Sequence, residues 1–162
     1  MKNLVFIRHG KSSWDYDFAD DLRPLKKRGV EDGKLIGEEL ITWNLNPDAI
    51  FSSPAKRAYD TCKIISEKIG YDIDNVEISE LLYDFDGKRV LNFIINLEED
   101  LDTVILFGHN HAFTALVNSL GSVSISNVPT TGVVWISFNT NDWHIKQTGT
   151  TVKTLFPKQL KN

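Results

Sequence analysis

Two short apolar segments that each lead into a histidine constrain the fold of this chain most. Leu4–Ile7 is followed by Arg8-His9-Gly10, and Val104–Phe107 is followed by Gly108-His109-Asn110. Unbroken apolar runs of this length are typical of parallel strands that are buried on both faces. Ligands of open α/β sheets bind beyond the carboxyl ends of such strands. Two of the four histidines are therefore predicted to lie at a ligand-binding rim.

The remaining pattern predicts an α/β fold. Strands are expected near residues 3–8, 48–52 and 103–108, and helical patterns lie between them. Strands that alternate with helices indicate βαβ units with right-handed crossovers. We therefore predict a three-layer α/β/α architecture with a mostly parallel central sheet. An antiparallel edge hairpin is expected from residues 133–138 and 143–146, with its turn at 139–142.

Four apolar stripes mark the expected helices. In the first, two glycines are expected to let the helix approach the sheet closely. The stripes comprise Gly33, Ile36, Gly37 and Leu40; Ala58, Cys62, Ile65 and Ile69; Val90, Leu91, Ile94 and Ile95; and Phe113, Leu116, Val117 and Leu120.

Length and charge narrow the class of protein. A chain of 162 residues is expected to form one domain, over residues 1–162, with a substantial core. The formal net charge of −4 argues against binding to nucleic acid or to anionic membranes. A single cysteine precludes an internal disulfide. We expect neither a leader peptide nor a membrane span, and hence a cytoplasmic protein.

A third segment is expected to reach the same rim. Residues 52–57 read Ser-Ser-Pro-Ala-Lys-Arg and follow the strand near 48–52. Ser53 suits a helix N-cap and Pro54 suits the first helical position, which places Arg57 in the opening turn. A cation near a helix N-terminus is unfavourable unless an anion binds there. Arg57 is therefore a candidate anion ligand, and an exposed arginine turned to water is the alternative.

Together these strand ends supply the parts of a phosphoryl-transfer site. Arg8 and Arg57 can each bind phosphate oxygens in a bidentate manner. A neutral His9 is a competent nucleophile, and His109, if protonated, would add positive charge. Fixed cations would do the neutralising, so no metal or other cofactor is expected.

The ordered motifs resemble the histidine phosphatase superfamily, whose fold is phosphoglycerate mutase-like and whose members open with Arg-His-Gly. The resemblance is closer still to the SixA-like branch, which acts on protein phosphohistidine. It covers nearly the whole chain, through Arg8–Trp14, Asp21–Leu25 with Arg28 and Gly29, Ser52–Ala58 with Thr61, Leu82-Tyr83, Gly108–Asn110 and Pro129–Gly132.

The resemblance implies a role for each matched residue. His9 would be the nucleophile that forms a transient phosphohistidine, and Arg8, Arg57 and His109 would line the phosphate pocket. Many members also use a carboxylic acid to protonate the leaving oxygen. That position falls near Asp84, with Glu80 and Asp86 as competitors, and a merely solvated acidic loop is the alternative.

Histidine at position 111 departs from the usual pattern of the family. His109 and His111 would share a face if the strand continued, which would make a metal pair. The strand is expected to end before them, so metal binding is not predicted. His111 is instead expected to touch substrate or to be exposed on the first turn of the next helix.

Three functions remain open. The leading one is a phosphatase that acts on phosphohistidine of a partner protein. The imidazole of a phosphohistidine is a good leaving group, so such a substrate depends little on a well-placed catalytic acid. For a phosphate ester, general acid catalysis contributes about 10²–10⁴-fold. The second is a small-molecule phosphomonoesterase or mutase. The third is a non-catalytic phosphate-binding module on the same fold.

Overall fold

The computed structural model describes residues 1–15 and 17–161 of the chain. A six-stranded sheet has the order β3-β2-β4-β1-β5-β6. The first four strands in this order are mutually parallel, whereas β5 is antiparallel to both β1 and β6. The strands are β1 Lys2–Arg8, β2 Ala49–Ser52, β3 Glu77–Ile78, β4 Thr103–Gly108, β5 Val133–Phe138 and β6 Thr150–Leu155.

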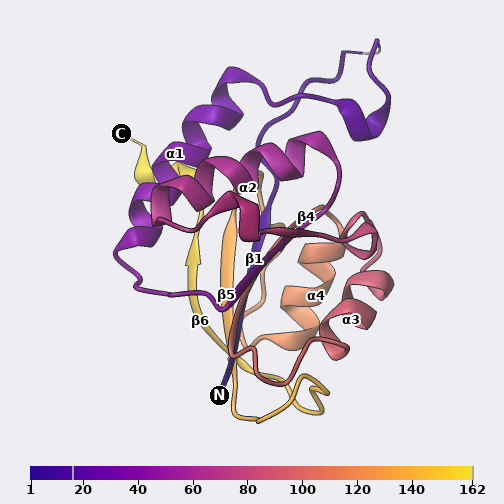
Figure 1. Ribbon diagram of the computed structural model, residues 1–162, viewed down its shortest axis with the longest axis vertical. Coiled ribbons are helices and arrows are strands. Elements are labelled where there is room, and N and C mark those ends of the chain that lie inside the picture. The colour runs from indigo at the N-terminus through magenta and orange to yellow at the C-terminus, as the bar shows by residue number, and fades with distance from the viewer. Residues whose placement is uncertain (16, 162) are drawn as a thin grey trace.

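Four α-helices cover the two faces of the sheet (Figure 1). On one face lie α1 Lys27–Ile41 and α2 Lys56–Ile69, and on the other lie α3 Lys88–Ile95 and α4 Ala112–Leu120. Short 3₁₀ turns span Asp20–Leu22, Ile73–Asn75, Glu80–Leu82 and Pro157–Leu160. The predicted three-layer fold class is thus confirmed. None of the helices in this described part of the chain is both long and apolar enough to cross a membrane.

The central strand β1 divides its side chains between two cores. Leu4 and Phe6 pack with α3 and α4, whereas Val5 and Ile7 pack with α1 and α2. Successive side chains of a strand point to opposite faces, so a strand between two helical layers must be apolar at every position. This explains the unbroken apolar runs in the sequence.

The glycines of α1 contact a helix rather than the sheet. A Cβ at position 37 would lie 2.7 Å from Cβ of Lys68, and one at position 33 would lie 3.1 Å from a methyl of Ile64. Both neighbours belong to α2. The predicted close approach to the sheet is therefore wrong at these glycines, which instead let α1 and α2 pack closely against each other.

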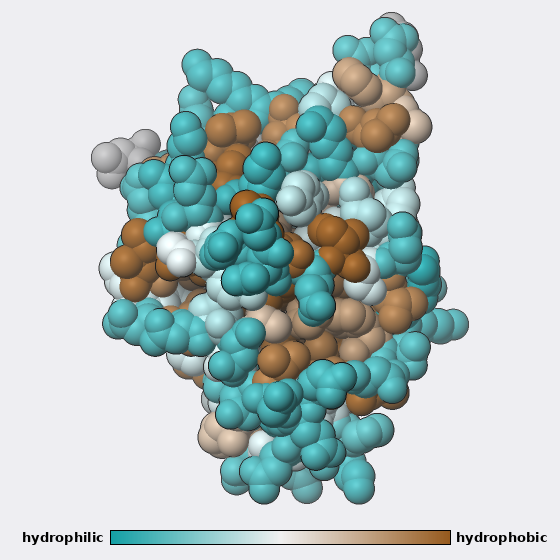
Figure 2. Space-filling model, viewed as in Figure 1, coloured by the Kyte–Doolittle hydropathy of each residue, from teal (hydrophilic) through white to brown (hydrophobic). Residues whose placement is uncertain are grey.

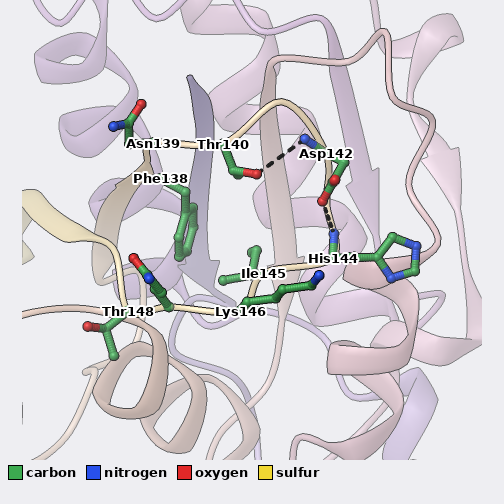
Figure 3. A pocket seen from close by; sticks show the side chains of 9 residues that line it. Phe138, Asn139, Thr140, Asp142, His144, Ile145, Lys146 and Thr148 are labelled. Carbon is green, nitrogen blue, oxygen red and sulfur yellow. Dashed lines mark hydrogen bonds between the residues drawn. The ribbon is translucent and has the colours of Figure 1, made fainter.

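The predicted hairpin had the wrong second strand. The partner of β5 is β6, and residues 143–146 are not in a strand. Trp143 instead lies in a loop with its side chain buried in the core, and its indole N–H donates to the Leu101 carbonyl at 2.9 Å. The loop 139–148 borders a cavity of about 390 Å³ together with Phe138 (Figure 3). β6 was missed because its burial is slight, as expected for an edge strand.

Candidate active site

The register of β1 and β4 brings the two predicted histidines together. Arg8 pairs with Gly108, and the His9 N–H donates to the Gly108 carbonyl at 3.0 Å. His9 and His109 therefore follow adjacent parallel strands, and their ring centroids lie 5.3 Å apart. Residues a hundred positions apart in the chain thus meet at the carboxyl edge of the sheet, as the sequence predicts.

His9 is held in one orientation. Its Nδ1 lies 2.8 Å from the Gly10 carbonyl oxygen. A carbonyl only accepts hydrogen bonds, so Nδ1 carries the proton and Nε2 keeps its lone pair. Arg57 Nε donates toward that lone pair over 3.4 Å.

The surroundings keep His9 uncharged. The ring is only 7% exposed. Burial lowers its pKa to about 3, the nearby charges of Arg57, Arg8 and Arg23 act in the same direction, and the hydrogen bond to Gly10 opposes them. A neutral imidazole with a directed lone pair is the form that can attack phosphorus.

Arg57 lies in the first turn of α2, as predicted, and is 1% exposed. Its helix begins later than expected, because Ala55 is the N-cap and Ser53 does not cap the helix. Arg57 Nη2 lies 3.1 Å from the Asp20 carboxylate, and Nη1 donates to the Asp20 backbone carbonyl at 2.6 Å. The cation is thus paired with a carboxylate.

Arg8 leaves part of its guanidinium free. Its Nη1 donates to the Val128 carbonyl at 2.9 Å, whereas its buried Nε has no hydrogen-bond partner among the described residues. Burial and the charge of Arg57 lower the pKa of Arg8. A buried N–H donor without a partner is costly, and an oxyanion would satisfy it.

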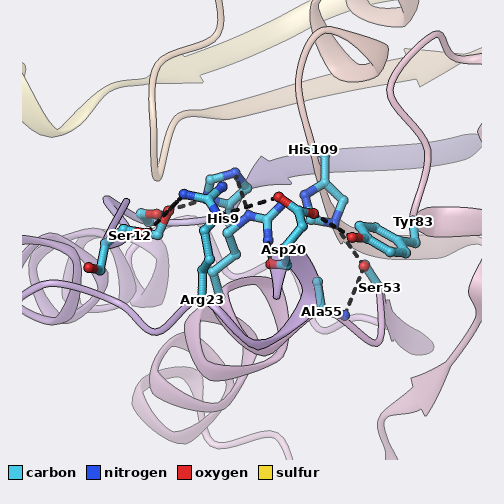
Figure 4. Close-up of polar contacts among 11 residues, drawn as sticks. His9, Ser12, Asp20, Arg23, Ser53, Ala55, Tyr83 and His109 are labelled. Carbon is cyan, nitrogen blue, oxygen red and sulfur yellow. Dashed lines mark hydrogen bonds and ion pairs between the residues drawn. The ribbon is translucent and has the colours of Figure 1, made fainter. Parts of the chain in front are cut away.

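His109 is fully buried and hydrogen-bonds to Ser53, whose Oγ lies 2.8 Å from Nε2. Burial first, and then the positive charges of its neighbours, lower its pKa to about 2. The ring is therefore neutral in this state, unlike the protonated form considered from the sequence. Its Nδ1 is buried without a partner in the described part of the chain and faces the His9 side (Figure 4).

Arg8, His9 and Arg57 border a pocket of about 310 Å³. Its side walls come from the loop after β1, from the start of α2, and from the loops around Phe85 and Thr130. The residues that line it are Arg8, His9, Lys11, Ser12, Trp14, Asp20, Arg23, Arg57, Phe85, Asn110, His111 and Thr130. His109 lies beside His9 but is fully buried, so unlike the prediction it does not line the pocket.

Two pocket residues extend the predicted set. Asp20 and Arg23 come from the 3₁₀ turn and the residue after it, and they form an ion pair at 3.3 Å. Arg23 also donates to Ser12 Oγ at 3.1 Å and stacks on Trp14 at 3.8 Å from the ring centroid. Arg23 belongs to the Arg-Pro-Leu motif noted in the sequence, whereas no sequence signal marked Asp20.

Asp84 is not brought to the pocket. Its carboxylate is 5% exposed, and one oxygen accepts the backbone N–H groups of Gly87, Arg89 and Val90, each at 3.1 Å. Asp84 thus holds the start of α3. Its expected competitors do not line the pocket either, since Asp86 accepts from the Lys88 backbone and Glu80 lies in a 3₁₀ turn.

His111 lies at the rim of the pocket as the exposed N-cap residue of α4. Among residues 1–15 and 17–161, no group of three or more His, Cys, Asp or Glu side chains is arranged to hold a metal ion. The cavity beside Phe138 lies at the opposite end of β1, because Phe138 pairs with Lys2. It shares no residue with the histidine site.

The fold and the paired histidines define an α/β protein with an arginine-lined pocket at the carboxyl edge of its sheet. The model of the histidine phosphatase superfamily (branch 1) matches residues 4–89. The chain belongs to this superfamily. His109 lies beyond the matched residues, and its place beside His9 comes from the sheet register.

Solved structures with the same fold cover almost the whole chain. A putative phosphohistidine phosphatase SixA from Agrobacterium tumefaciens is 20% identical with a TM-score of 0.80, over 96% of this chain and 98% of that one. The protein histidine phosphatase SixA complexed with tungstate is 20% identical with a TM-score of 0.82, over 98% and 99%. At 20% sequence identity, this similarity shows a shared fold and nothing more.

Curated relatives match over shorter stretches. An uncharacterised chloroplastic protein of Arabidopsis thaliana is 29% identical over 133 residues, which cover 76% of this chain and 61% of that protein. A 2,3-bisphosphoglycerate-dependent phosphoglycerate mutase of Haemophilus ducreyi is 39% identical over 69 residues, which cover 40% and 30%. The chain thus spans less than two thirds of either relative.

Proposed function

We propose that this protein is a metal-independent phosphatase that forms a covalent phosphohistidine on His9. One observation carries the proposal: a buried, neutral His9 has its Nδ1 proton fixed on Gly10, so its Nε2 lone pair lies beside Arg57. We further propose that the substrate is phosphohistidine on a partner protein.

The first step follows from this geometry. The phosphoryl oxygens bind Arg57 and the free Nε of Arg8, which spread the charge that develops in the transition state. If Ser53 donates its hydroxyl proton to His109 Nε2, the proton of His109 lies on the buried Nδ1, next to the His9 ring. His9 Nε2 then bonds to phosphorus as the bond to the leaving group breaks.

The second step regenerates the enzyme. Water bonds to phosphorus, the bond from phosphorus to Nε2 breaks, and the electron pair returns to Nε2. With the Nδ1 proton still held on Gly10, the products are neutral His9 and dihydrogen phosphate. The fixed cations neutralise the phosphoryl group throughout, so the scheme requires no metal.

Two features favour phosphohistidine as the substrate. Asp84 does not line the pocket, and the carboxylate that does, Asp20, is paired with Arg57. A phosphoimidazole that is protonated on its distal nitrogen releases a neutral imidazole without an added proton. An alkoxide leaving group, in contrast, needs a proton from a catalytic acid. The loop beside the pocket also presents Trp14, Phe18 and Leu22 to solvent, with Trp14 73% exposed. Apolar surface gathers on this projecting loop (Figure 2), where a protein substrate can dock.

The proposal is tested with a histidine-phosphorylated protein domain in the presence of a metal chelator. We expect rapid phosphate release, acid-labile phosphate on His9 after brief exposure, and a loss of about 10³-fold or more in His9→Ala. His144→Ala is the control, since His144 is exposed and far from the pocket. Equal release by His9→Ala would reject the proposal.

A second candidate function is a small-molecule phosphomonoesterase or mutase. It is favoured by the match of 69 residues to a phosphoglycerate mutase. It predicts faster turnover of phosphate esters than of phosphohistidine when both are offered to the wild-type protein. Absence of any phosphate on His9 with either substrate would point to a non-catalytic phosphate-binding module.

A further inference from the structure

Asp20 is the one carboxylate among the described residues that line the pocket. We propose that Asp20 selects phosphoramidate substrates by accepting a hydrogen bond from the distal N–H of the substrate's protonated phosphoimidazole ring. This inference rests on the proposed function and names the residue that would set its substrate class.

Asp20 is held in its charged form. Its carboxylate binds Arg57 Nη2 at 3.1 Å and Arg23 Nε at 3.3 Å, and it accepts a hydrogen bond from the Tyr83 hydroxyl. Burial acts to raise its pKa, but the Tyr83 hydrogen bond and the arginine charges outweigh this and lower it. A carboxylate with a lowered pKa is a poor proton donor and a stable hydrogen-bond acceptor.

The carboxylate lies beside the place that a phosphoryl group on His9 would occupy. Nε and Nη2 lie on the same edge of a guanidinium group. In Arg57, Nε faces His9 Nε2 and Nη2 faces the Asp20 carboxylate. A phosphoryl group on His9 would take this edge and move the carboxylate outward. The Asp20 side chain is 48% exposed on a short turn, and its contacts with Arg23 Nε and the Tyr83 hydroxyl do not use this edge, so they can keep the carboxylate beside the pocket.

Charge then separates two classes of substrate. A carboxylate beside a phosphoryl dianion repels it, and this repulsion disfavours a phosphate ester, whose leaving oxygen offers no proton. A protonated phosphoimidazole carries a positive ring between the two anions and an N–H to donate. Asp20 therefore favours the second class.

The transfer step balances without an added proton. The His9 Nε2 lone pair forms the new bond to phosphorus, and the electron pair of the broken bond goes to the substrate nitrogen. The substrate ring keeps its proton on the distal nitrogen, hydrogen-bonded to Asp20, and departs neutral. The His9 ring gains the positive charge, and its distal N–H already donates to Gly10. Each imidazole thus has an oxygen acceptor for its distal proton.

The test compares Asp20→Asn with the wild type on phosphoimidazole and on p-nitrophenyl phosphate, whose leaving group needs no proton. We expect kcat/KM for phosphoimidazole to fall by about 10- to 100-fold, and that for p-nitrophenyl phosphate to stay level or rise. Asp21→Asn is the matched control, because Asp21 is an exposed neighbour in the same turn that does not line the pocket.

Two further arms sharpen the result. Asp20→Glu keeps the charge and should retain the preference for phosphoimidazole. A phosphoimidazolium methylated on its distal nitrogen keeps the positive charge but lacks the N–H, so Asp20→Asn should lose less with it. Equal loss with both imidazole probes would overturn the hydrogen-bond assignment.

Failure of the inference differs from failure of the proposed function. If the wild type does not hydrolyse phosphoimidazole or phosphohistidine, the proposed function is wrong. If it does, and Asp20→Asn changes both kcat/KM values by the same factor, Asp20 only orders Arg57 or competes with phosphate. That result would overturn the role of Asp20 in substrate selection but would leave the proposed phosphatase activity unchallenged.

Discussion

Burial of the two site histidines ties the charge state of the nucleophile to the stability of the fold. The pKa of His9 is about 3 and that of His109 about 2, against 6.5 for an ordinary histidine. The unfolded chain therefore binds more protons than the folded one as the pH falls below 6.5. The stability that each neutral ring contributes is fully present above pH 6.5 and is lost as the pH falls toward 3.

We predict that the free energy of unfolding falls by about 2 kcal/mol per buried histidine between pH 7 and pH 5. Urea denaturation at both pH values measures this loss. His9→Gln removes one of the two titrating rings. The fall in the free energy of unfolding between pH 7 and pH 5 should therefore be about half of that in the wild type. His144→Gln, at an exposed position, is the control. The same pH dependence in His9→Gln as in the wild type would contradict the neutral assignment.

Residues at strand ends could be predicted from the sequence, and residues from irregular loops could not. Arg8, His9 and His109 follow apolar runs, and parallel strands bring such residues to one edge. Asp20 reaches the pocket through the loop between β1 and α1, whose path depends on Arg23 binding Ser12. No periodicity predicts such a path.

At the scale of elements, Asp84 shows that a carboxylate before a helix has two possible roles, and in this structure it lies outside the pocket and holds the start of α3. Asp84 precedes α3 by a few residues, which is a pattern typical of helix capping as well as of an acidic active-site loop. Its oxygen accepts from the backbone of Gly87, Arg89 and Val90. The capping signal in the sequence could have favoured the structural role.

We predict that Asp84→Ala lowers the free energy of unfolding by about 2–3 kcal/mol, because it leaves buried N–H groups without partners. Its kcat below the unfolding transition should stay within about twofold of wild type. Asp86→Ala is the control, since this exposed carboxylate accepts the Lys88 N–H at 2.8 Å and should cost about 1 kcal/mol or less. Urea denaturation and phosphate release are the measurements.

The opposite pattern would restore Asp84 as the catalytic acid. A kcat lowered by 100-fold or more, with an unchanged free energy of unfolding, cannot arise from loss of a helix cap. It would also mean that the loop around Phe85 rearranges when substrate binds, since Asp84 does not line the pocket.

The antiparallel half of the sheet shows a second limit of sequence patterns. Residues 143–146 alternate like a strand because Trp143 is buried, yet this side chain fills a gap near Leu101. β6 has mostly exposed or half-buried side chains, so its apolar pattern is weak. The parallel strands β1, β2 and β4 were predicted correctly because burial on both faces leaves a clear apolar run, whereas the short, exposed parallel strand β3 was not predicted.

At the scale of the whole molecule, the pocket concentrates positive charge within a chain of net charge −4. Arg8, Arg23 and Arg57 all line it, and Asp20 is the carboxylate partner of Arg23 and Arg57 there. Burial and the nearby charge of Arg57 lower the pKa of Arg8, and a bound anion would offset this repulsion. An oxyanion that binds the folded chain alone should therefore stabilise the entire fold.

We predict that tungstate at about 100 times its dissociation constant raises the free energy of unfolding by about 2.7 kcal/mol. For a chain of this size the midpoint of thermal unfolding should rise by roughly 5–10 °C. Arg57→Lys should lose most of this rise, because an ammonium lacks the planar fork that matches an oxyanion. Arg28→Lys makes the same change at an exposed position of α1 and should keep the full rise. An equal rise in both variants would mean that tungstate binds outside the histidine pocket, at another basic surface of the protein.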